Sequence, residues 1–245
     1  MPQTAQTDKL AYWLIKKINK ANRDFDLIAD GDRIAVAVSG GKDSLTLLEL
    51  LHRRKRSVPT DYTLVPVHII SDWRCTDQDQ RTWLEQYFQS LGLEYAFREI
   101  AIMRDELGHR REPSCFWCAW NRRKALFQTA HELGCNKVAF GHHADDIART
   151  TLLNLFYHGR LETMEPKVEF FGGVITVIRP LAYVPEKEIV RFAEAAGFPL
   201  RRLTCPHAAT SKRAKMAQLL RQIEKECPQA KVNLFRAVWR AKGAN

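Results

Sequence analysis

The sequence lacks any apolar run long enough to span a membrane, and its polar N-terminus lacks the apolar segment typical of a signal peptide. It also contains no internal repeat and no low-complexity stretch, which argues against solenoids and disordered chains. We therefore expect a cytoplasmic protein that has no membrane partner. Its 245 residues suffice for one domain with additions, or for two small domains.

The sequence also has fewer acidic than basic residues. The chain has 38 lysines and arginines against 28 aspartates and glutamates, and its net charge is +10. This excess indicates a polyanionic partner, although solubility alone would also explain a basic surface. Six cysteines are present, and in a protein that looks cytosolic they favour metal binding or catalysis over disulfides.

The most informative stretch joins a strand pattern at residues 34–38 to a helical pattern that begins with Leu45 and Leu48 on one face. Between them lie the six residues of the SGGKDS loop: Ser39, Gly40, Gly41, Lys42, Asp43 and Ser44. Glycines allow a close backbone approach, and the N–H groups and dipole of a helix N-terminus attract anions. The stretch therefore predicts a phosphate-binding loop, with Lys42 and Asp43 as the catalytic candidates.

Asp43 refines this prediction because it would repel a phosphate unless a cation, such as Mg²⁺, lay between them. A Walker A loop would need a glycine in place of Val36 and a serine or threonine in place of Asp43. The three-glycine fingerprint of dinucleotide-binding folds is absent as well. The loop instead resembles the SGGxDS loop of the PP-loop ATP pyrophosphatases, which split ATP between the α and β phosphates. A tight turn whose glycines serve only packing is the alternative.

Strand and helix patterns alternate along most of the chain. Further strands are expected at residues 63–70, 95–100, 137–140 and 174–178, and helices at 77–91, 122–133, 147–157 and 186–196. This alternation predicts an α/β fold, a parallel sheet with helices on both faces. In such folds ligands bind beyond the carboxyl ends of the strands.

Helical additions are expected at both ends of this unit. An amphipathic helix covers residues 10–21, and two helices cover residues 211–226 and 230–241. From Lys212 onward there are nine lysines and arginines against two glutamates. We expect an N-terminal helical segment at residues 1–30, a PP-loop ATP pyrophosphatase domain at 31–203 and a basic C-terminal helical segment at 204–245.

A second polar motif, Gly141-His142-His143-Ala144-Asp145-Asp146, directly follows the strand at residues 137–140. In a parallel sheet it would face the phosphate loop. His142 suits a phosphate or adenine contact, and Asp145 suits a helix N-cap or a metal ligand; plain capping by Asp145 with exposed histidines is the alternative. The ATP-binding candidates outside the SGGKDS loop are Gly141, His142, Asp145 and, from the second strand, His68.

The third motif is Cys115-Phe116-Trp117-Cys118, whose two thiolates have a chelating spacing. A loop precedes it, and a helix from Asn121 follows. Cys205 is the one further cysteine in a comparable loop. Three cysteines fit an iron–sulfur cluster with one iron left open. Zinc with His207 as a fourth ligand and a redox disulfide are the alternatives. The other three cysteines lack such a context: Cys75, Cys135 and Cys227.

Together these motifs resemble the tRNA 2-thiocytidine synthetase family of PP-loop ATP pyrophosphatases. The shared stretches are SGGKDS, Cys115-x-x-Cys118 followed by two arginines, GHHADD, NLFYHG at 154–159 and IRPLA at 178–182. The resemblance implies that the protein binds ATP and holds a [4Fe-4S] cluster on Cys115, Cys118 and Cys205. It also implies that the protein replaces the C2 oxygen of an anticodon-loop cytidine by sulfur. It further implies tRNA, a sulfur donor such as a cysteine desulfurase and a possible homodimer as partners.

One position departs from the family pattern, since Ala208 stands where members carry a further cysteine; three thiolates remain. Candidates for RNA phosphate contacts are Arg122, Arg123, Arg179, Lys212 and Arg213. A thiouridine synthetase, a lysidine-type ligase and a cluster-dependent small-molecule desulfurase are alternative enzymes, and a non-catalytic RNA-binding protein is the other alternative. Iron content and pyrophosphate release from ATP distinguish among these functions.

Overall fold

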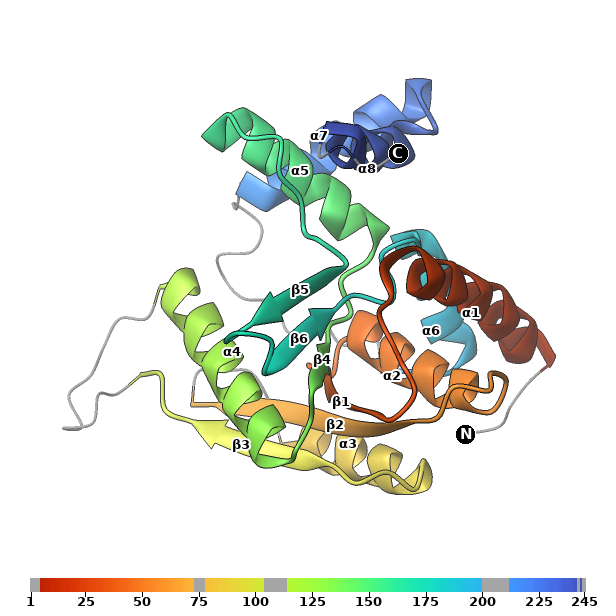
Figure 1. The fold of residues 1–245 in the computed structure, drawn as a ribbon, viewed down its shortest axis with the longest axis vertical. Coiled ribbons are helices and arrows are strands. Elements are labelled where there is room, and N and C mark those ends of the chain that lie inside the picture. The colour runs from red at the N-terminus through yellow and green to blue at the C-terminus, as the bar shows by residue number, and fades with distance from the viewer. Residues whose placement is uncertain (1–4, 73–77, 104–113, 200–211, 242, 244–245) are drawn as a thin grey trace.

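The computed structural model describes residues 5–72, 78–103, 114–199, 212–241 and 243 (Figure 1). Its elements are, in order, α1 Ala5–Phe25, β1 Asp32–Ala37, α2 Lys42–Lys55, β2 Tyr62–Ser71, α3 Gln78–Ser90, β3 Ala96–Ile100, α4 Cys115–Glu132, β4 Lys137–Ala139, α5 Ala144–His158, β5 Lys167–Phe170, β6 Ile175–Ile178, α6 Glu186–Ala195, α7 Lys212–Glu226 and α8 Ala230–Ala241. No helix within the described ranges has the length and apolar character needed to cross a membrane.

Six strands form one sheet in the order β3-β2-β1-β4-β6-β5. All neighbouring pairs are parallel except β5 and β6, which are antiparallel. The predicted α/β fold is thus confirmed, with the correction that one edge strand runs against the other five. No strand was predicted at β5, because an alternation of charged and apolar residues over only four positions is a short signal. A tight turn through Phe171, Gly172 and Gly173, all at positive φ, returns the chain into β6.

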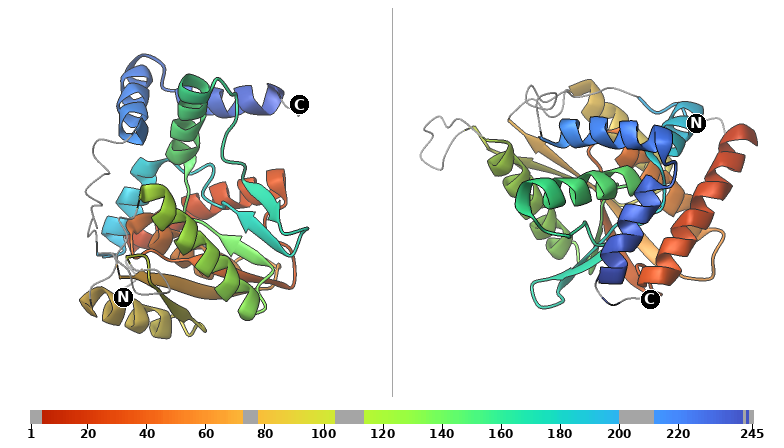
Figure 2. Two further views of the ribbon diagram at one scale, coloured as in Figure 1. Left: turned by 90° about the vertical axis from the view of Figure 1, so that its left-hand side faces the viewer. Right: turned by 90° about the horizontal axis from the view of Figure 1, so that it is seen from above.

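Helices cover both faces of the sheet, as predicted (Figure 2). One core cluster unites α1, α2, α3 and α6 with the sheet, and it contains Leu14, Leu48, Phe88 and Phe192. The other unites α4 with the opposite face, where Leu126 and Ala130 belong to the same cluster as strand residues. Alternate residues of each strand serve the two clusters, since successive side chains point to opposite faces.

Helix α5 joins neither layer. Its buried residues Ala148 and Leu152 form a third apolar cluster with Met216 and Leu220 of α7, and Leu234 of α8 packs against it. Figures 1 and 2 show α5, α7 and α8 as a separate group of helices beyond the carboxyl end of β4. The basic C-terminal helices therefore lie on the side of the sheet where a ligand is expected.

Helix α4 begins at Cys115, and the predicted start near residue 122 is wrong. Ser114 is the N-cap, and its hydroxyl accepts a hydrogen bond from Trp117 N at 3.2 Å. A serine N-cap satisfies a backbone donor that the first turn would otherwise leave without a partner. The two cysteines of the third motif thus belong to the first turn of a helix instead of the loop before it.

Candidate functional site

The candidate site lies where the strand order of the sheet reverses. β1 lies in the middle of the strand order. The next two strands along the chain, β2 and β3, lie on one side of β1, and β4 lies on the other. The loops after β1 and β4 diverge at such a point, and the crevice between them is where α/β sheets bind ligands. The SGGKDS loop follows β1, and the GHHADD motif follows β4.

The SGGKDS loop is held in shape by its own hydroxyl groups. Ser44 Oγ accepts a hydrogen bond from Ser39 N at 3.1 Å and donates one to Gly41 O at 2.9 Å. Gly40 has a φ of +81°, a conformation that favours glycine. Gly41 is the N-cap of α2 and has no side chain to cap the helix. The N–H groups of the first turn of α2 therefore suit a bound anion.

Gly141 brings the second loop into contact with the first. A Cβ atom on Gly141 would lie 3.0 Å from both C and O of Asp43, and 3.1 Å from Ser44 N. These are backbone atoms of a helix start, so they cannot rotate away as a flexible side chain would. Only a glycine allows this approach, which packs the GHHADD motif directly against the phosphate loop.

His68 contacts the backbone just before the SGGKDS loop. Its side chain is fully buried, and Nδ1 lies 2.6 Å from the carbonyl oxygen of Val38, the residue before the loop. Burial lowers the pKa of His68 to about 4, with the charges of Arg122 and Arg81 acting in the same direction. The ring is therefore neutral at physiological pH, and it fixes the backbone from which the loop departs.

Ion pairs connect the loop to α6. Lys42 Nζ lies 2.8 Å from Asp43 Oδ1 and 3.1 Å from Glu186 Oε1, and Arg149 Nη2 lies 2.5 Å from Glu186 Oε2. Burial lowers the pKa of Lys42, but these carboxylates outweigh it and raise that pKa. Burial would raise the pKa of Glu186, but the hydrogen bond from Arg149 and the charge of Lys42 lower it to about 2. Both side chains are consequently charged at physiological pH.

Sequence reasoning missed Glu186. The only signal is its place directly after Pro185, at the start of a helix that closely follows the IRPLA stretch. An acidic residue in the first turn of a helix is favoured by the helix dipole in any protein. The sequence alone therefore gives no reason to place Glu186 beside Lys42.

Asp145 joins three helices. Its Oδ2 accepts a hydrogen bond from Glu186 N at 2.7 Å, and its Oδ1 lies 2.5 Å from Nζ of Lys231 in α8. The N-cap of α5 is His143, so the interpretation of Asp145 as an N-cap is wrong. His143 is also buried, and its Nε2 lies 3.3 Å from Asp146 Oδ2 and 3.7 Å from Asp43 Oδ1. Lys231 is a second site residue that the sequence did not reveal.

His142 lines a pocket of about 220 Å³ together with Arg149 of α5 and Arg213 of α7. Its ring stacks on Phe140, with 5.4 Å between the ring centroids. Burial, followed by the charges of Arg179 and Arg213, lowers the pKa of His142 to about 3. The buried Nδ1 atom has no hydrogen-bond partner among the described residues. A neutral ring with an unused nitrogen is suited to the edge of a base more than to a phosphate.

The predicted RNA-contact residues surround this pocket in part. The charges of Arg123, Arg179 and Arg213 all act on His142. Burial and the neighbouring Arg123 lower the pKa of Arg179 to about 10, so its guanidinium is still charged; its Nη1 donates to the Glu165 carbonyl. Lys212 lies elsewhere on α7, with Nζ 4.5 Å from the centre of the Tyr157 ring.

The cysteine motif occupies the first turn of α4. Cys115 is the first residue of the helix, and the half-buried Cys118 lies one turn later. A helix N-terminus stabilises a thiolate. Trp117 and Trp120 of the same helix stack on each other, with their ring centroids 5.7 Å apart. Cys205, His207 and Ala208 lie outside the described residues, so the three-cysteine cluster stays a prediction.

Known proteins resemble the chain along most of its length. The family described as PP-loop domain matches residues 11–202. The tRNA-cytidine(32) 2-sulfurtransferase of Citrifermentans bemidjiense is 41% identical over 240 residues, which cover 96% of this chain and 92% of that protein. The chain belongs to the tRNA-cytidine(32) 2-sulfurtransferase family. A second 2-sulfurtransferase, from Geobacter sulfurreducens, is 42% identical over 237 residues, 94% of this chain and 91% of that protein.

A solved structure supports the fold of this 2-sulfurtransferase family member. The U34-tRNA thiolase NcsA from Methanococcus maripaludis, solved with its [4Fe-4S] cluster, superimposes with a TM-score of 0.77. The two chains are 22% identical, and the match covers 96% of this chain and 79% of that one. At this level of identity the likeness concerns the fold, and it confirms the PP-loop architecture predicted from the sequence.

Proposed function

We propose that this protein thiolates tRNA in an ATP-dependent reaction, replacing the C2 oxygen of a cytidine by sulfur. The close approach of Gly141 to the backbone of Asp43 carries the proposal, because it unites the phosphate loop and the GHHADD motif in one crevice. The relatives act on cytidine 32 by name, and their identity of about 40% supports the same target in the anticodon loop. An unpaired loop base can enter such a crevice, whereas a paired base cannot.

The first step is adenylation of the base. ATP binds with its phosphates on the SGGKDS loop, and the C2 oxygen of cytidine attacks the α-phosphorus while the bond to pyrophosphate breaks. Lys42 and the N-terminus of α2 stabilise the charge that develops on pyrophosphate. The neutral His142 and the charged Arg213 line the pocket through which the base reaches this point.

The second step is displacement of AMP. A nucleophilic sulfur attacks C2, the bond from C2 to the adenylated oxygen breaks, and AMP leaves with that oxygen. Cys115, Cys118 and Cys205 would hold a [4Fe-4S] cluster, whose open iron would supply this sulfur. The place of the first two cysteines at a helix N-terminus fits thiolate ligands.

Asp43 is the candidate ligand for Mg²⁺. Its carboxylate and that of Asp146 both lie within 4 Å of His143 Nε2, at 3.7 and 3.3 Å, so two oxygen donors face one small region. Mg²⁺ is usually bound by one or two carboxylates together with substrate phosphates. The ion would offset the repulsion between Asp43 and ATP.

The charges around His142 support phosphate contacts by three of the candidates, Arg123, Arg179 and Arg213. We assign the phosphate contacts to Arg122, Arg123, Arg179, Lys212 and Arg213. A cysteine desulfurase as the sulfur donor and assembly into a homodimer stay predictions.

The decisive experiment combines the anaerobic protein with unmodified tRNA, ATP, Mg²⁺ and sulfide, followed by mass analysis of the nucleosides. We expect 2-thiocytidine at position 32 and one AMP for each thiolated base. A thiolated uridine, or a cytidine that has been joined to an amine, would overturn the assignment in favour of another PP-loop enzyme. Binding of tRNA with no pyrophosphate release would indicate a non-catalytic protein.

A further inference from the structure

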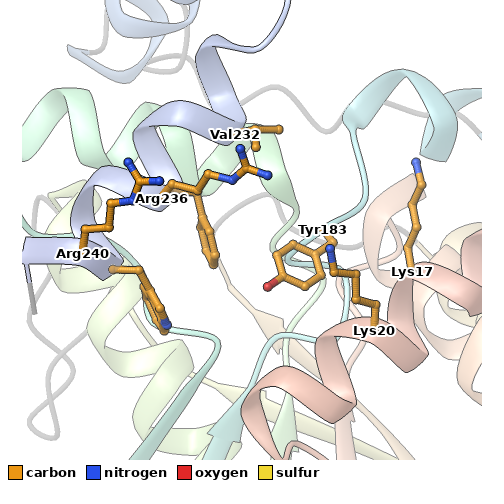
Figure 3. A pocket seen from close by; sticks show the side chains of 8 residues that line it. Lys17, Lys20, Tyr183, Val232, Arg236 and Arg240 are labelled. Atoms are coloured by element: carbon orange, nitrogen blue, oxygen red, sulfur yellow. The ribbon is translucent and has the colours of Figure 1, made fainter. Parts of the chain in front are cut away.

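A second hollow lies between α1 and α8, outside the crevice described above. Its volume is about 460 Å³, within the range typical of ligand pockets. Figure 3 shows lysines of α1 on one side, arginines of α8 on the other and Tyr183 between them. The residues that matter are Lys20, Tyr183, Phe235, Arg236, Trp239 and Arg240.

Aromatic rings form the wall of this hollow. Phe235 and Trp239 of α8 stack face to face, with centroids 5.0 Å apart and ring planes 10° from parallel. Tyr183 meets Phe235 edge-on at 5.5 Å, and its hydroxyl donates to Asp24 at 2.9 Å. Phe25 lies behind these rings and contacts three of them. The rings are only half-buried, so part of the stacking surface faces the hollow.

The cations at the rim are mostly uncompensated. No acidic side chain of the described residues lies within ion-pair distance of Lys20, Arg236 or Arg240, and all three are exposed. Lys20 Nζ lies 5.1 Å from the centre of the Tyr183 ring, and Lys17 is paired with Glu188 at 2.5 Å. The hollow is lined by four cations, Lys17 and these three, against the two nearby carboxylates of Asp24 and Glu188, so it is positive.

The hollow is connected to the catalytic crevice by α8. Lys231, which pairs with Asp145, begins this helix, and Arg236 and Arg240 lie one and a half to two and a half turns further along. At a rise of 1.5 Å per residue, Arg240 lies about 14 Å along the helix from Lys231. On the other side of the hollow, Tyr183 lies three residues before Glu186, the first residue of α6. A single RNA strand could thus contact both places.

We propose that this hollow, the α1–α8 pocket, binds an unpaired nucleotide of the tRNA away from the reacting cytidine. Aromatic faces beside free cations form the usual surface for single-stranded nucleic acid, since bases stack on the rings and phosphates pair with the cations. The pocket holds this second contact while the reacting base enters the crevice. The inference rests on the proposed function, because it takes tRNA as the substrate.

The test compares two variants that lose the same charge. Lys20→Gln/Arg236→Gln/Arg240→Gln neutralises the pocket, and Lys55→Gln/Arg56→Gln/Arg98→Gln neutralises exposed cations at the far end of α2 and on β3. We measure tRNA affinity at several salt concentrations and thiolation at rising tRNA concentration. The pocket variant should bind tRNA about tenfold more weakly, and its salt slope should fall by about 2. Its KM for tRNA should rise while kcat stays unchanged.

The outcomes separate the two proposals. If the unaltered protein does not thiolate cytidine, the proposed function fails by itself. If the unaltered protein is active and both triple variants retain its affinity and salt slope, the α1–α8 pocket does not bind tRNA. An equal loss in both variants would also overturn the inference, because it would reflect net charge alone. Trp239→Leu provides a charge-neutral check: it should weaken tRNA binding while its salt slope stays that of the unaltered protein, and unchanged affinity would exclude stacking.

Discussion

Lys42 is the residue on which most of the charges in the site converge. It contacts Asp43 within the loop and Glu186 on α6, and Glu186 is in turn held by Arg149. A lysine placed between two carboxylates stays charged and keeps a defined position. ATP phosphates that reach the loop would exchange with one of those carboxylates, so the lysine changes partners without losing its charge.

Replacing Lys42 or Asp43 by alanine should lower the release of AMP from ATP by a factor of about 100 or more. Lys42 stabilises charge on the leaving group directly, and Asp43 would do so through the Mg²⁺ ion that it holds. Both variants should keep the iron content of the unaltered protein, because the loop is remote in sequence from the cysteines. The measurements are AMP formation in the presence of tRNA and iron per chain. Full AMP production by both variants would contradict the role of the loop.

Glu186→Gln should slow AMP formation about tenfold, because an amide makes weaker hydrogen bonds to Lys42 and Arg149 than a carboxylate does. Glu188→Gln is the matched control, since Glu188 lies on the same helix and pairs with Lys17 instead. Single-turnover rates at saturating ATP are the appropriate measurement. Equal rates in the two variants would show that Glu186 does not position Lys42.

The buried side chain of His68 should make the free energy of unfolding depend on pH. Its folded pKa of about 4 lies below the value of about 6.5 expected when unfolded, so unfolding takes up a proton between these values. The contribution of His68 is fully present above pH 6.5 and is lost as the pH falls toward 4. From pH 7 to pH 5 the loss is about 2 kcal/mol. In His68→Asn, the difference in unfolding free energy between these pH values should shrink accordingly, whereas the exposed His158→Asn should leave it unchanged.

At the scale of elements, sequence patterns located those that bury a regular apolar face. The strand of Ala35 and Val36 was predicted from a continuous apolar run, and the helix of Leu45 and Leu48 from apolar residues that share one helical face. β5 was missed because it is only four residues long, although its charged and apolar residues alternate as those of a strand do. The early start of α4 was missed because Phe116, Trp117 and Trp120 show no amphipathic pattern, and only the cap at Ser114 marks it.

The residues of the candidate site also fall into those that the sequence revealed and those that it did not. The SGGKDS and GHHADD motifs were found because each lies in one continuous stretch beside a strand. Glu186 and Lys231 could not be found, since they reach the crevice from α6 and α8 through tertiary packing. No local pattern encodes a contact between residues so far apart in the sequence.

The first turn of α4 carries a prediction about iron. Replacing Cys115, Cys118 or Cys205 by serine should abolish the iron–sulfur absorption after anaerobic reconstitution, together with thiolation. Replacing Cys75, Cys135 or Cys227 by serine should retain both. Cys135 is buried in the core, Cys227 lies between α7 and α8, and Cys75 lies outside the described residues. Stoichiometric zinc without iron, or a cluster that survives Cys205→Ser, would contradict the three-cysteine site.

For the whole molecule, the helices α5, α7 and α8 act as one structural unit above the sheet. Truncation before Lys212 removes the basic tail, but it also exposes Ala148 and Leu152 of α5. Exposing these two side chains costs about 3 kcal/mol, which corresponds to a fall in Tm of about 10 °C for a chain of this size. Thermal unfolding of the truncated protein measures this. If its Tm is unchanged, the helical unit is not needed for stability, and loss of tRNA binding on truncation reports charge alone.

The ion pair between Lys231 and Asp145 has a consequence for the order of events. It joins α8, the helix that carries Arg236 and Arg240, to the first turn of α5 within the GHHADD motif. Where two ligands bias the same contact, their binding free energies are coupled, and the coupling is equal in both directions. If RNA bound on α8 shifts this ion pair, as the proposed α1–α8 pocket implies, RNA and ATP would alter each other's affinity by the same factor. Such coupling would make the binding of tRNA and the binding of ATP linked events instead of independent ones.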